Sequence, residues 1–542
     1  MNAWLEIDSG ADGCQINLVN PTDSPPMVGP GLTLPVLAGI SAIQRPLSIP
    51  GIASAPTSSM DAQLDNARGV LTQLWGQSPP LRRAARVRTD AGSVFEGIIT
   101  TLQAGVQLTI GMESGADRPL SDNLPLRTNA VWGGWKDVKV LPWVWGGCTL
   151  APIQYSEDQR TFVLADHPIA DVDQVTRDDV PTAAYAWYNG VDSTGRAVAF
   201  LELAQPLADG ERLAATVRGR MHPDTGLLLQ TPAEILHDLL ANLARAPVQW
   251  SDLDDYRTQT QEWVLGGLLD DNAISIRAAV DGLMQSCGGA WSAAMPGIAM
   301  AWPAAADPAA PAQRVDELTA TDLQAGTDAT GIYTSLRVLY DYDHAAQRYR
   351  RAIQLQAPDA IKAYGTLEME WPAPWLRTPR HAEQLGQRML SWLARPRWRV
   401  TWRQSFADVP TGAWVDVAHA ISPVQGRHRL VSAELDLSGA QLSCAIESPV
   451  GDAPVIETAR LSTAFEPVIQ PGITVEIANG EIIFTARDEQ GNAIAGAAIT
   501  LDGGLTRIAD AAGRVSFPVQ RGRHTLRIEA QGYAPAETIV VI

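Results

Sequence analysis

The histidines are the side chains of this sequence best suited to acid–base or metal chemistry near neutral pH, and they are scattered. The corner Asp166-His167-Pro168 follows the apolar run 161–165, where a general base could stand at the end of a strand. A turn that closes the strand explains the same residues and is the favoured interpretation. His419 and His428 flank an expected strand–loop–strand and could converge on a metal ion, but no third ligand stands at a suitable spacing. We therefore predict a site at neither place.

Two carboxylate clusters come next, Asp252/Asp254/Asp255 and Asp270/Asp271. Both precede expected helices, so helix capping and the helix dipole account for them. Sequence spacing alone does not exclude the paired carboxylates of a glycosidase. Nothing, however, singles out one pair from the others.

The sequence lacks the short motifs that carry catalysis or cofactor binding. It contains no GxSxG elbow, no HExxH, no GxxxxGK[ST] loop and no dinucleotide fingerprint after a strand. The four cysteines, Cys14, Cys148, Cys287 and Cys444, are far apart and form no CxxC pair, so a reduced state is expected. We predict that the protein is not an enzyme and has no catalytic, cofactor-binding or metal-binding residues.

Length and charge narrow the classes further. A chain of 542 residues is too long for one core and predicts several domains. The net charge of −19 argues against nucleic acid as a main partner, because phosphate binding requires a basic surface. Nearly all basic residues are arginine, the lysines being only Lys136, Lys139 and Lys362. Arginine suits subunit interfaces, although genome base composition is the favoured explanation.

No targeting or membrane segment is expected. The start, MNAWLEIDSG, lacks the basic and apolar regions of a secretory signal. The uncharged stretches 24–44 and 282–306 are broken by proline and glycine, so neither predicts a membrane span. We expect a soluble chain without stable membrane insertion.

Residues 1–120 predict a β-rich domain with a long Pro/Gly arm at 21–60. The runs 94–103 and 106–112 read as two strands of a meander. The arm is too apolar for a solvated tether, so it either orders against a neighbouring subunit or covers its own domain's core. Residues 61–76 predict a helix that ends at Gly76.

The middle of the chain divides into a β-rich, tryptophan-dense domain at 121–228 and a helical α/β domain at 229–312. Core packing is the default explanation for the tryptophans, because a sugar platform would require them exposed; they are Trp132, Trp135, Trp143, Trp145 and Trp187. Thr231-Pro232-Ala233-Glu234 is a capping box that opens a helix, and residues 273–287 predict a second helix. A hairpin should turn at Pro296-Gly297.

Residues 313–452 predict a β-barrel-like domain with one helix, which Thr378-Pro379 opens and Pro396 closes. Residues 453–472 predict a linker, and 473–542 a separate small β-sandwich. No repeat with a period of 20 to 50 residues stands out.

Two resemblances add to these predictions. Residues 473–542, with Asp488 to Gly491, Ile494 to Ala497, Gly513, Phe517 and Gly532-Tyr533, resemble the carboxypeptidase-regulatory-like, transthyretin-like β-sandwich family. Val515 and Phe517 should face its core. This resemblance implies a fold and no catalytic residues.

The order of elements over residues 1–450 resembles the baseplate hub, or central tail-tip protein, of long-tailed bacteriophages. It runs from two β-rich parts through the helical pair at 231–287 and the helix at 379–394 to a closing β-run with GAWVDVAH and HRLVSAELDL. The resemblance implies a multi-domain, mainly β fold with α+β parts, in which tail-tube-like β-barrel domains alternate with α/β domains, followed by the C-terminal sandwich.

The same resemblance implies a structural role in the virion, at the tail tip, after synthesis in the host cytoplasm. It implies a homotrimer that closes the tail tube and contacts the distal tail ring, the tape measure and tip fibres, with genome DNA only passing through the lumen. The alternative is a receptor- or glycan-binding tail protein that acts through the C-terminal sandwich or the tryptophan-dense domain.

Overall fold

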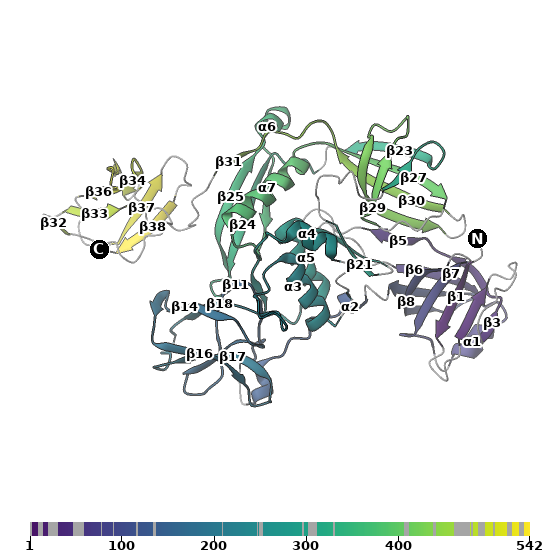
Figure 1. Cartoon of the computed structure of the whole chain (residues 1–542), viewed down its shortest axis with the longest axis horizontal. Helices are drawn as coiled ribbons and strands as arrows, with labels where there is room; N and C mark the ends of the chain where they lie inside the picture. The colour runs from purple at the N-terminus through teal and green to yellow at the C-terminus, as the bar shows by residue number, and fades with distance from the viewer. Residues whose placement is uncertain are drawn as a thin grey trace.

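The computed structural model shows several separate sheets and few helices, so the chain is multi-domain and mainly β with α+β parts, as predicted (Figure 1). The residues that the structure describes are 3–8, 15–19, 31–46, 59–76, 79–89, 92–114, 118–133, 137–208, 210–245, 248, 253–294, 297–301, 312–328, 331–405, 411–436, 441–459, 477–478, 481–485, 494–501, 505–517, 523–529 and 536–541.

The first sheet has eight strands in the order β3-β2-β1-β7-β8-β9-β6-β4. Its elements are β1 (Ala3–Asp8), β2 (Gln15–Val19), β3 (Gly31–Leu34), β4 (Leu37–Ile40), β6 (Ser59–Asp65), β7 (Ala84–Thr89), β8 (Gly92–Gln103) and β9 (Gln107–Ser114), with helix α1 (Val70–Trp75). The predicted meander is confirmed, because β8 pairs antiparallel with both β7 and β9.

The helix predicted over 61–76 is wrong in its first half. Residues 59–65 form strand β6, in which Met60, Ala62 and Leu64 are buried and their neighbours exposed. That alternation is the period of a half-buried strand. Only α1 is helical, burying Leu71 and Trp75 and ending at Gly76.

The second sheet has seven strands and recruits one of them from the N-terminal arm. Its own strands are β22 (Ala312–Val315), β23 (Thr321–Asp328), β27 (Arg397–Ser405), β28 (Trp414–Val417), β29 (Gly426–Asp436) and β30 (Gln441–Pro449), in the order β22-β28-β29-β30-β27-β23. The recruited strand is β5 (Ile43–Pro46), which pairs antiparallel with residues 432–435 of β29. The described part of the arm, 31–46, therefore packs on its own chain. Residues 21–30 and 47–58 of the arm lie outside the described residues.

The two sheets share one hydrophobic core. Its buried members come from both sheets, among them Leu5, Val87 and Ile110 of the first and Val400, Trp402 and Ile446 of the second. Figure 1 shows β5 between the purple first sheet and the green second sheet. We call this unit the paired sheets.

Five strands of the first sheet have topological counterparts in the second. The order β7-β8-β9-β6-β4 corresponds to β28-β29-β30-β27-β23, and every neighbouring pair in both series is antiparallel. Both central hairpins shift register at the same point, after Ile99 in β8 and after Leu430 in β29. The next neighbours differ, since β1 is antiparallel to β7 whereas β22 is parallel to β28.

The backbone around these two register shifts agrees in detail. Ile99 exchanges two backbone hydrogen bonds with segment 82–83, at 2.8 and 3.0 Å, and Leu430 exchanges two with segment 412–413, also at 2.8 and 3.0 Å. The first residue of each segment has a positive φ, 64° in one case and 88° in the other. The same bulged hairpin and the same turn are thus built twice from different residues.

Within the tryptophan-dense region, residues 147–218 are β-rich as predicted and form two four-stranded antiparallel sheets around one core. The orders are β11-β18-β14-β15 and β12-β13-β17-β16. The strands are β11 (Gly147–Leu150), β12 (Ile153–Gln154), β13 (Thr161–Ala165), β14 (Asp171–Arg177), β15 (Val180–Thr182), β16 (Tyr185–Val191), β17 (Ala197–Leu203) and β18 (Leu213–Arg218).

A helical core lies at the centre of the chain. The predicted capping box at Thr231 is present at the start of α3, and α5 ends at Gly288, whose φ of 68° is the left-handed conformation that glycine adopts without strain. The elements of this helical core are α2 (Arg118–Ser121), the 3₁₀ turn η1 (Asn129–Trp132), α3 (Pro232–Asp238), the π-turn η2 (Leu239–Leu243), α4 (Asp254–Thr260) and α5 (Ile276–Cys287). Its strands are β10 (Trp143–Trp145), β19 (Gly267–Leu269) and the hairpin of β20 (Ala290–Ala294) and β21 (Gly297–Ala301). No described helix is long and apolar enough to cross a membrane.

Residues 313–452 do not form one unit, contrary to the predicted boundary, because the chain between β23 and β27 packs on the helical core. This insertion holds β24 (Ser335–Asp343), β25 (Arg348–Gln356), α6 (Pro358–Tyr364), β26 (Glu368–Pro372) and α7 (Pro379–Leu393). Thr378 caps α7 as predicted, while α6 is a second helix that was not predicted. The predicted linker, 453–472, contains a strand, β31 (Glu457–Ala459), which pairs with β25.

The C-terminal residues form two sheets, β32-β33-β36 and β35-β34-β37-β38, with a hydrophobic cluster of their own. Val515 and Phe517 are buried in it, as expected. The strands are β32 (Ile477–Ala478), β33 (Glu481–Thr485), β34 (Ala498–Leu501), β35 (Leu505–Ile508), β36 (Arg514–Phe517), β37 (Arg523–Glu529) and β38 (Ala536–Val541).

Candidate functional site

The Asp166-His167 corner is part of a buried charge network. The Asp166 carboxylate, 1% exposed, lies 3.3 Å from Arg127 and 3.5 Å from Arg196. Burial raises the pKa of Asp166, and the two arginines partly offset this effect. Arg127 also bridges to Asp192 at 2.5 Å. Burial would raise the pKa of Asp192 as well, but hydrogen bonds led by that of Thr194 outweigh it and hold the pKa well below its usual range. The network ties the 127–132 segment to the β-sheets behind it.

His167 has both ring nitrogens engaged. Nε2 accepts a hydrogen bond from the Val144 amide at 2.9 Å, so Nδ1 carries the proton and donates to the Pro168 carbonyl at 2.8 Å. Burial lowers the pKa of His167 to about 4. A neutral imidazole with no free lone pair cannot accept a substrate proton, so the corner acts as a clasp between β10 and β13.

The other candidates for chemistry lie apart. His428 contacts the Gln425 carbonyl at 3.0 Å, and across the described residues no three His, Cys, Asp or Glu side chains group as metal ligands. Asp254 begins α4 and pairs with Arg257, as expected, whereas Asp271 accepts the Ala273 amide in a turn before α5. The described cysteines are free and buried. Asp252 and Cys14 lie outside the described residues.

The tryptophans of the dense region are mainly structural. Trp145 is fully buried and donates to Asp238 at 2.7 Å, and Trp143 is 6% exposed. These two side chains face the helical core, while Val144 between them faces the core of the β-domain. The two-stranded sheet of β10 and β19 therefore lies between the two cores. Trp132 and Trp187 are half-buried, and Trp135 lies outside the described residues.

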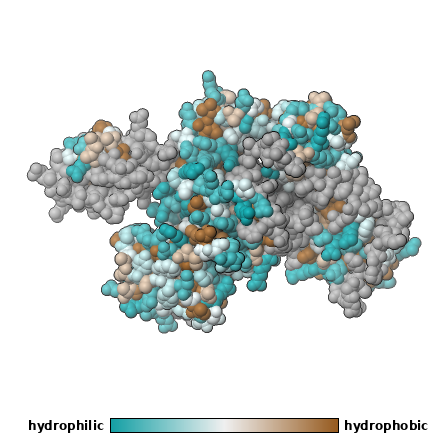
Figure 2. Space-filling view, in the orientation of Figure 1, coloured by the Kyte–Doolittle hydropathy of each residue, from teal (hydrophilic) through white to brown (hydrophobic). Residues whose placement is uncertain are grey.

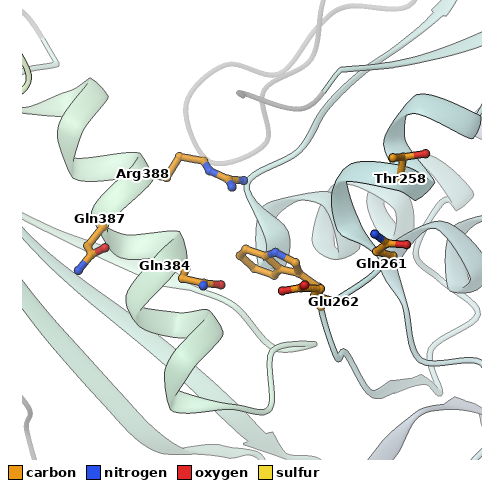
Figure 3. A pocket seen from close by; sticks show the side chains of 7 residues that line it. Thr258, Gln261, Glu262, Gln384, Gln387 and Arg388 are labelled. Carbon is orange, nitrogen blue, oxygen red and sulfur yellow. The ribbon is translucent and has the colours of Figure 1, made fainter. Parts of the chain in front are cut away.

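A shallow pocket of about 540 Å³ opens between α4 and α7. Figure 3 shows Gln384, Gln387 and Arg388 on one side and Thr258, Gln261 and Glu262 on the other. Beneath them the Trp263 ring stacks on His381 at 5.1 Å. Burial lowers the pKa of His381, whose Nδ1 faces the Thr378 hydroxyl at 2.8 Å. The lining can hold polar groups by its amides but brings no nucleophile and base together. Its halves are some 120 residues apart in sequence, so no sequence signal could join them.

A second groove, of about 510 Å³, runs between the β11-β18-β14 face and the tip of the β24–β25 hairpin. Its centre is neutral, with the Thr149 and Thr216 hydroxyls 3.0 Å apart. The charged groups of its rim are already paired, and Arg177 holds the pKa of Glu211 at about 2. The face of the molecule seen in Figure 2 is mainly hydrophilic, with small separate apolar patches among the coloured residues. Neither hollow has the geometry of an active site.

The paired sheets are the arrangement with the clearest capacity for assembly. Ile43 of β5 is 1% exposed and pairs with Leu435 of β29, so the arm seals the joint between the sheets. Strand addition supplies both backbone hydrogen bonds and a buried apolar anchor. The composition of the arm predicts its presence but not its acceptor, because register between segments almost 400 residues apart leaves no local signal.

Comparisons with known proteins were made by sequence and by structure. A scan against protein-family models found no match, and a search of curated protein sequences found no match. Solved structures do resemble the chain. A tail protein from Neisseria meningitidis MC58 has a TM-score of 0.40 and 9% identity, covering 83% of this chain and 97% of that chain.

Two more structures show the range of this likeness. The 43 kDa tail protein of prophage MuSo2 from Shewanella oneidensis has a TM-score of 0.39 and 8% identity, covering 82% of this chain and 97% of that one. A component of the type VI secretion system of Escherichia coli has a TM-score of 0.35 and 8% identity, covering 93% and 97%. At these scores the likeness carries no argument about this chain.

Proposed function

We propose that the chain is a structural component of a phage tail tip, a baseplate hub that closes the tail tube and organises the proteins attached there. The observation that carries the proposal is the pair of topologically equivalent sheets joined through β5 in one chain. Such a pair suits a ring-shaped assembly, because each copy presents the same β-scaffold twice.

The assembly is a homotrimer. Three copies of a two-sheet chain present six equivalent sheets around a closed axis, so a threefold hub can meet a sixfold tube without a mismatch.

The partners are other tail proteins: the distal tail ring, the tape measure and tip fibres. Genome DNA only passes through the lumen, and the net charge of −19 keeps it from adhering. The protein resides in the virion tail tip after synthesis in the host cytoplasm. It acts by assembly and not as an enzyme, in keeping with the clasp geometry of His167.

The C-terminal sheets are a transthyretin-like β-sandwich that decorates the hub. Its described core contains only Phe484 and Phe517 as aromatic residues, which favours a grip on a neighbouring protein over glycan reading. The buried tryptophans of the dense domain likewise give no support to a sugar platform.

Cryo-electron microscopy of the particle that contains the chain tests this function. We expect three copies at the tube end, with the six sheets related by near-sixfold symmetry. A monomer bound at the tail side, or a lumen face that is mostly basic, contradicts the proposal. Deleting residues 473–542 separates the roles of the C-terminal sheets: tails that assemble but do not adsorb indicate a receptor reader, and failed assembly indicates a clamp.

A further inference from the structure

The paired sheets differ at one point where their backbones are otherwise equivalent. In the second sheet, β29 continues past its register shift, and residues 432–435 pair on one side with β30 and on the other with β5. In the first sheet, β8 continues in the same way, and residues 101–103 pair with β9 on one side. Within the described residues, no strand pairs with the other side. We call that side the open edge of β8.

The correspondence between the two edges is residue by residue. Counting from the matched register shifts, Thr101, Leu102 and Gln103 stand where Ser432, Ala433 and Glu434 stand in β29. Both series alternate polar, apolar, polar. The apolar member of each packs toward the common core, Leu102 half-buried and Ala433 1% exposed.

In the first sheet, the chain that precedes β7 turns away from the open edge of β8. A turn closes through the Pro80 carbonyl and the Arg83 amide at 3.2 Å, so the backbone departs from β8 directly after Ile99 is paired. Exposure agrees with an open edge. Thr101, Gln103 and Ala104 are exposed, whereas Leu435, the counterpart of Ala104, is buried beneath β5.

We propose that the open edge of β8 accepts an extended strand from a different polypeptide, added antiparallel as β5 is added to β29. An edge with unpaired amides and carbonyls next to a partly covered apolar core is a template for strand addition. The chain's own arm strand is already committed to β29, and the place of the arm in the second sheet is taken by the folded insertion 331–396. A second copy therefore has no described arm strand to donate.

The surroundings define the chemistry of the incoming strand. Ala104 is smaller than its counterpart Leu435, and Val106 beside it is 75% exposed, so the position equivalent to Ile43 should carry a large apolar side chain. Arg82 and Arg83 stand at the other end of the edge. An antiparallel strand places its C-terminal end there, and that end should be neutral or acidic.

The probe is the β5 sequence with Arg45 replaced by glutamine, since β5 fits the equivalent edge and this replacement makes its C-terminal end neutral. The full-length chain carrying Gln103→Cys and Cys14→Ser is mixed, in a glutathione redox buffer, with a peptide of residues 41–48 in which Gln44 is replaced by cysteine. Position 44 lies opposite Glu434, and therefore opposite residue 103 in the equivalent register. We expect the mixed disulfide to form at least about tenfold faster than with the control chain Gln107→Cys, because only the bound register brings the two β-carbons together.

A second pair guards against a variant that does not fold. Thr101→Cys should react with a peptide carrying Pro46→Cys, the partner of Ser432, and not with one carrying Arg45→Cys. Equal rates for the edge and control positions overturn the proposal. Without peptide, disulfide-linked dimers that form about tenfold faster from Gln103→Cys chains than from Gln107→Cys chains also overturn it, because they place the β8 edges of two copies against each other. Both readouts use the isolated chain, so they are distinguishable from the failure of a trimer to appear in the particle.

Discussion

The paired sheets have the same five-strand order but differ in what fills the gap between corresponding strands. Between β4 and β6 the first sheet carries the arm that contains β5, while between β23 and β27 the second carries an entire α/β insertion that packs on the helical core. The bulged hairpin and the turn at its side are kept in both. Register and bulge position therefore define this scaffold, whereas the loops at its end differ in length and content.

The corresponding strands β6 of the first sheet and β27 of the second show how the residues can change on that scaffold. Inward, Met60, Ala62 and Leu64 correspond to Val400, Trp402 and Gln404, so large and small side chains exchange places within one shared core. Outward, the series Ser59, Asp61, Gln63 and Asp65 corresponds to Arg399, Thr401, Arg403 and Ser405. The outward row of β6 thus carries two aspartates and that of β27 two arginines, at alternate and not at equivalent positions.

Ile43→Asp should have the largest effect, because it attacks the joint between the sheets. The side chain is 1% exposed and would place an unpaired carboxylate in the common core. We expect a loss of about 4 kcal/mol or more in the free energy of unfolding and release of the arm to proteolysis. Leu32→Asp, at a strand position that is 50% exposed, is the matched control. Equal thermal stability of the two variants would show that β5 does not hold the sheets together.

Trp402→Ala should rank second, since it deletes a side chain 2% exposed whose indole donates to Gln404 at 2.9 Å. The cavity should cost about 3–5 kcal/mol in chemical denaturation. The reciprocal change, Ala62→Leu, overpacks the equivalent position and should cost about 1–3 kcal/mol. A cost below about 1 kcal/mol for Trp402→Ala would mean that the two inward rows do not share one core.

Much of this fold is readable from sequence where one period dominates a segment. Helices with clear caps, at Thr231 and Thr378, and alternating strands such as β8 and β27 follow from local rules. The error at 59–65 arose because a strand period ends where a short helix begins, so Leu64 and Leu71 read as one helical face. The seven-residue α6 and the insertion were missed because packing on a distant core, not local pattern, decides where they belong.

The paired sheets and the strand that accepts β5 could not be predicted from the sequence. The correspondence between Ile99 and Leu430 rests on hydrogen-bond register and a positive φ, neither of which requires similar residues. Strands β8 and β29 are more than 300 residues apart, so a search for short repeats finds nothing. The acceptor of β5 is equally non-local.

Mild acid should destabilise the tryptophan-dense region before it destabilises the paired sheets. His167 has a pKa of about 4 in the fold against 6.5 for the ordinary side chain, so the unfolded chain binds the proton first as the pH falls. The stability that neutral His167 contributes is complete above pH 6.5 and is lost between 6.5 and about 4, by up to about 3 kcal/mol. Hydrogen exchange, corrected for intrinsic rates, should show residues 143–218 losing protection before β27–β30. His167→Gln should flatten this pH dependence, and an unchanged profile in that variant contradicts the assignment.

The double change Arg399→Ser and Arg403→Gln, which gives the second sheet the residues of the first at these two outward positions, should have the smallest effect on folding. Arg399 pairs with Glu447 at 3.1 Å and Arg403 with Asp322 at 3.7 Å, both at the surface. Exposed pairs of this kind contribute little, so the free energy of unfolding should change by less than about 1 kcal/mol.

If the outward rows of β6 and β27 meet across subunits, incorporation of the variant into tails should fall and its salt dependence should weaken, because an attractive surface pair is lost. The reciprocal variant, Asp61→Thr with Asp65→Ser, should behave alike. Normal incorporation of both variants at every salt concentration would show that these two outward rows do not meet across subunits.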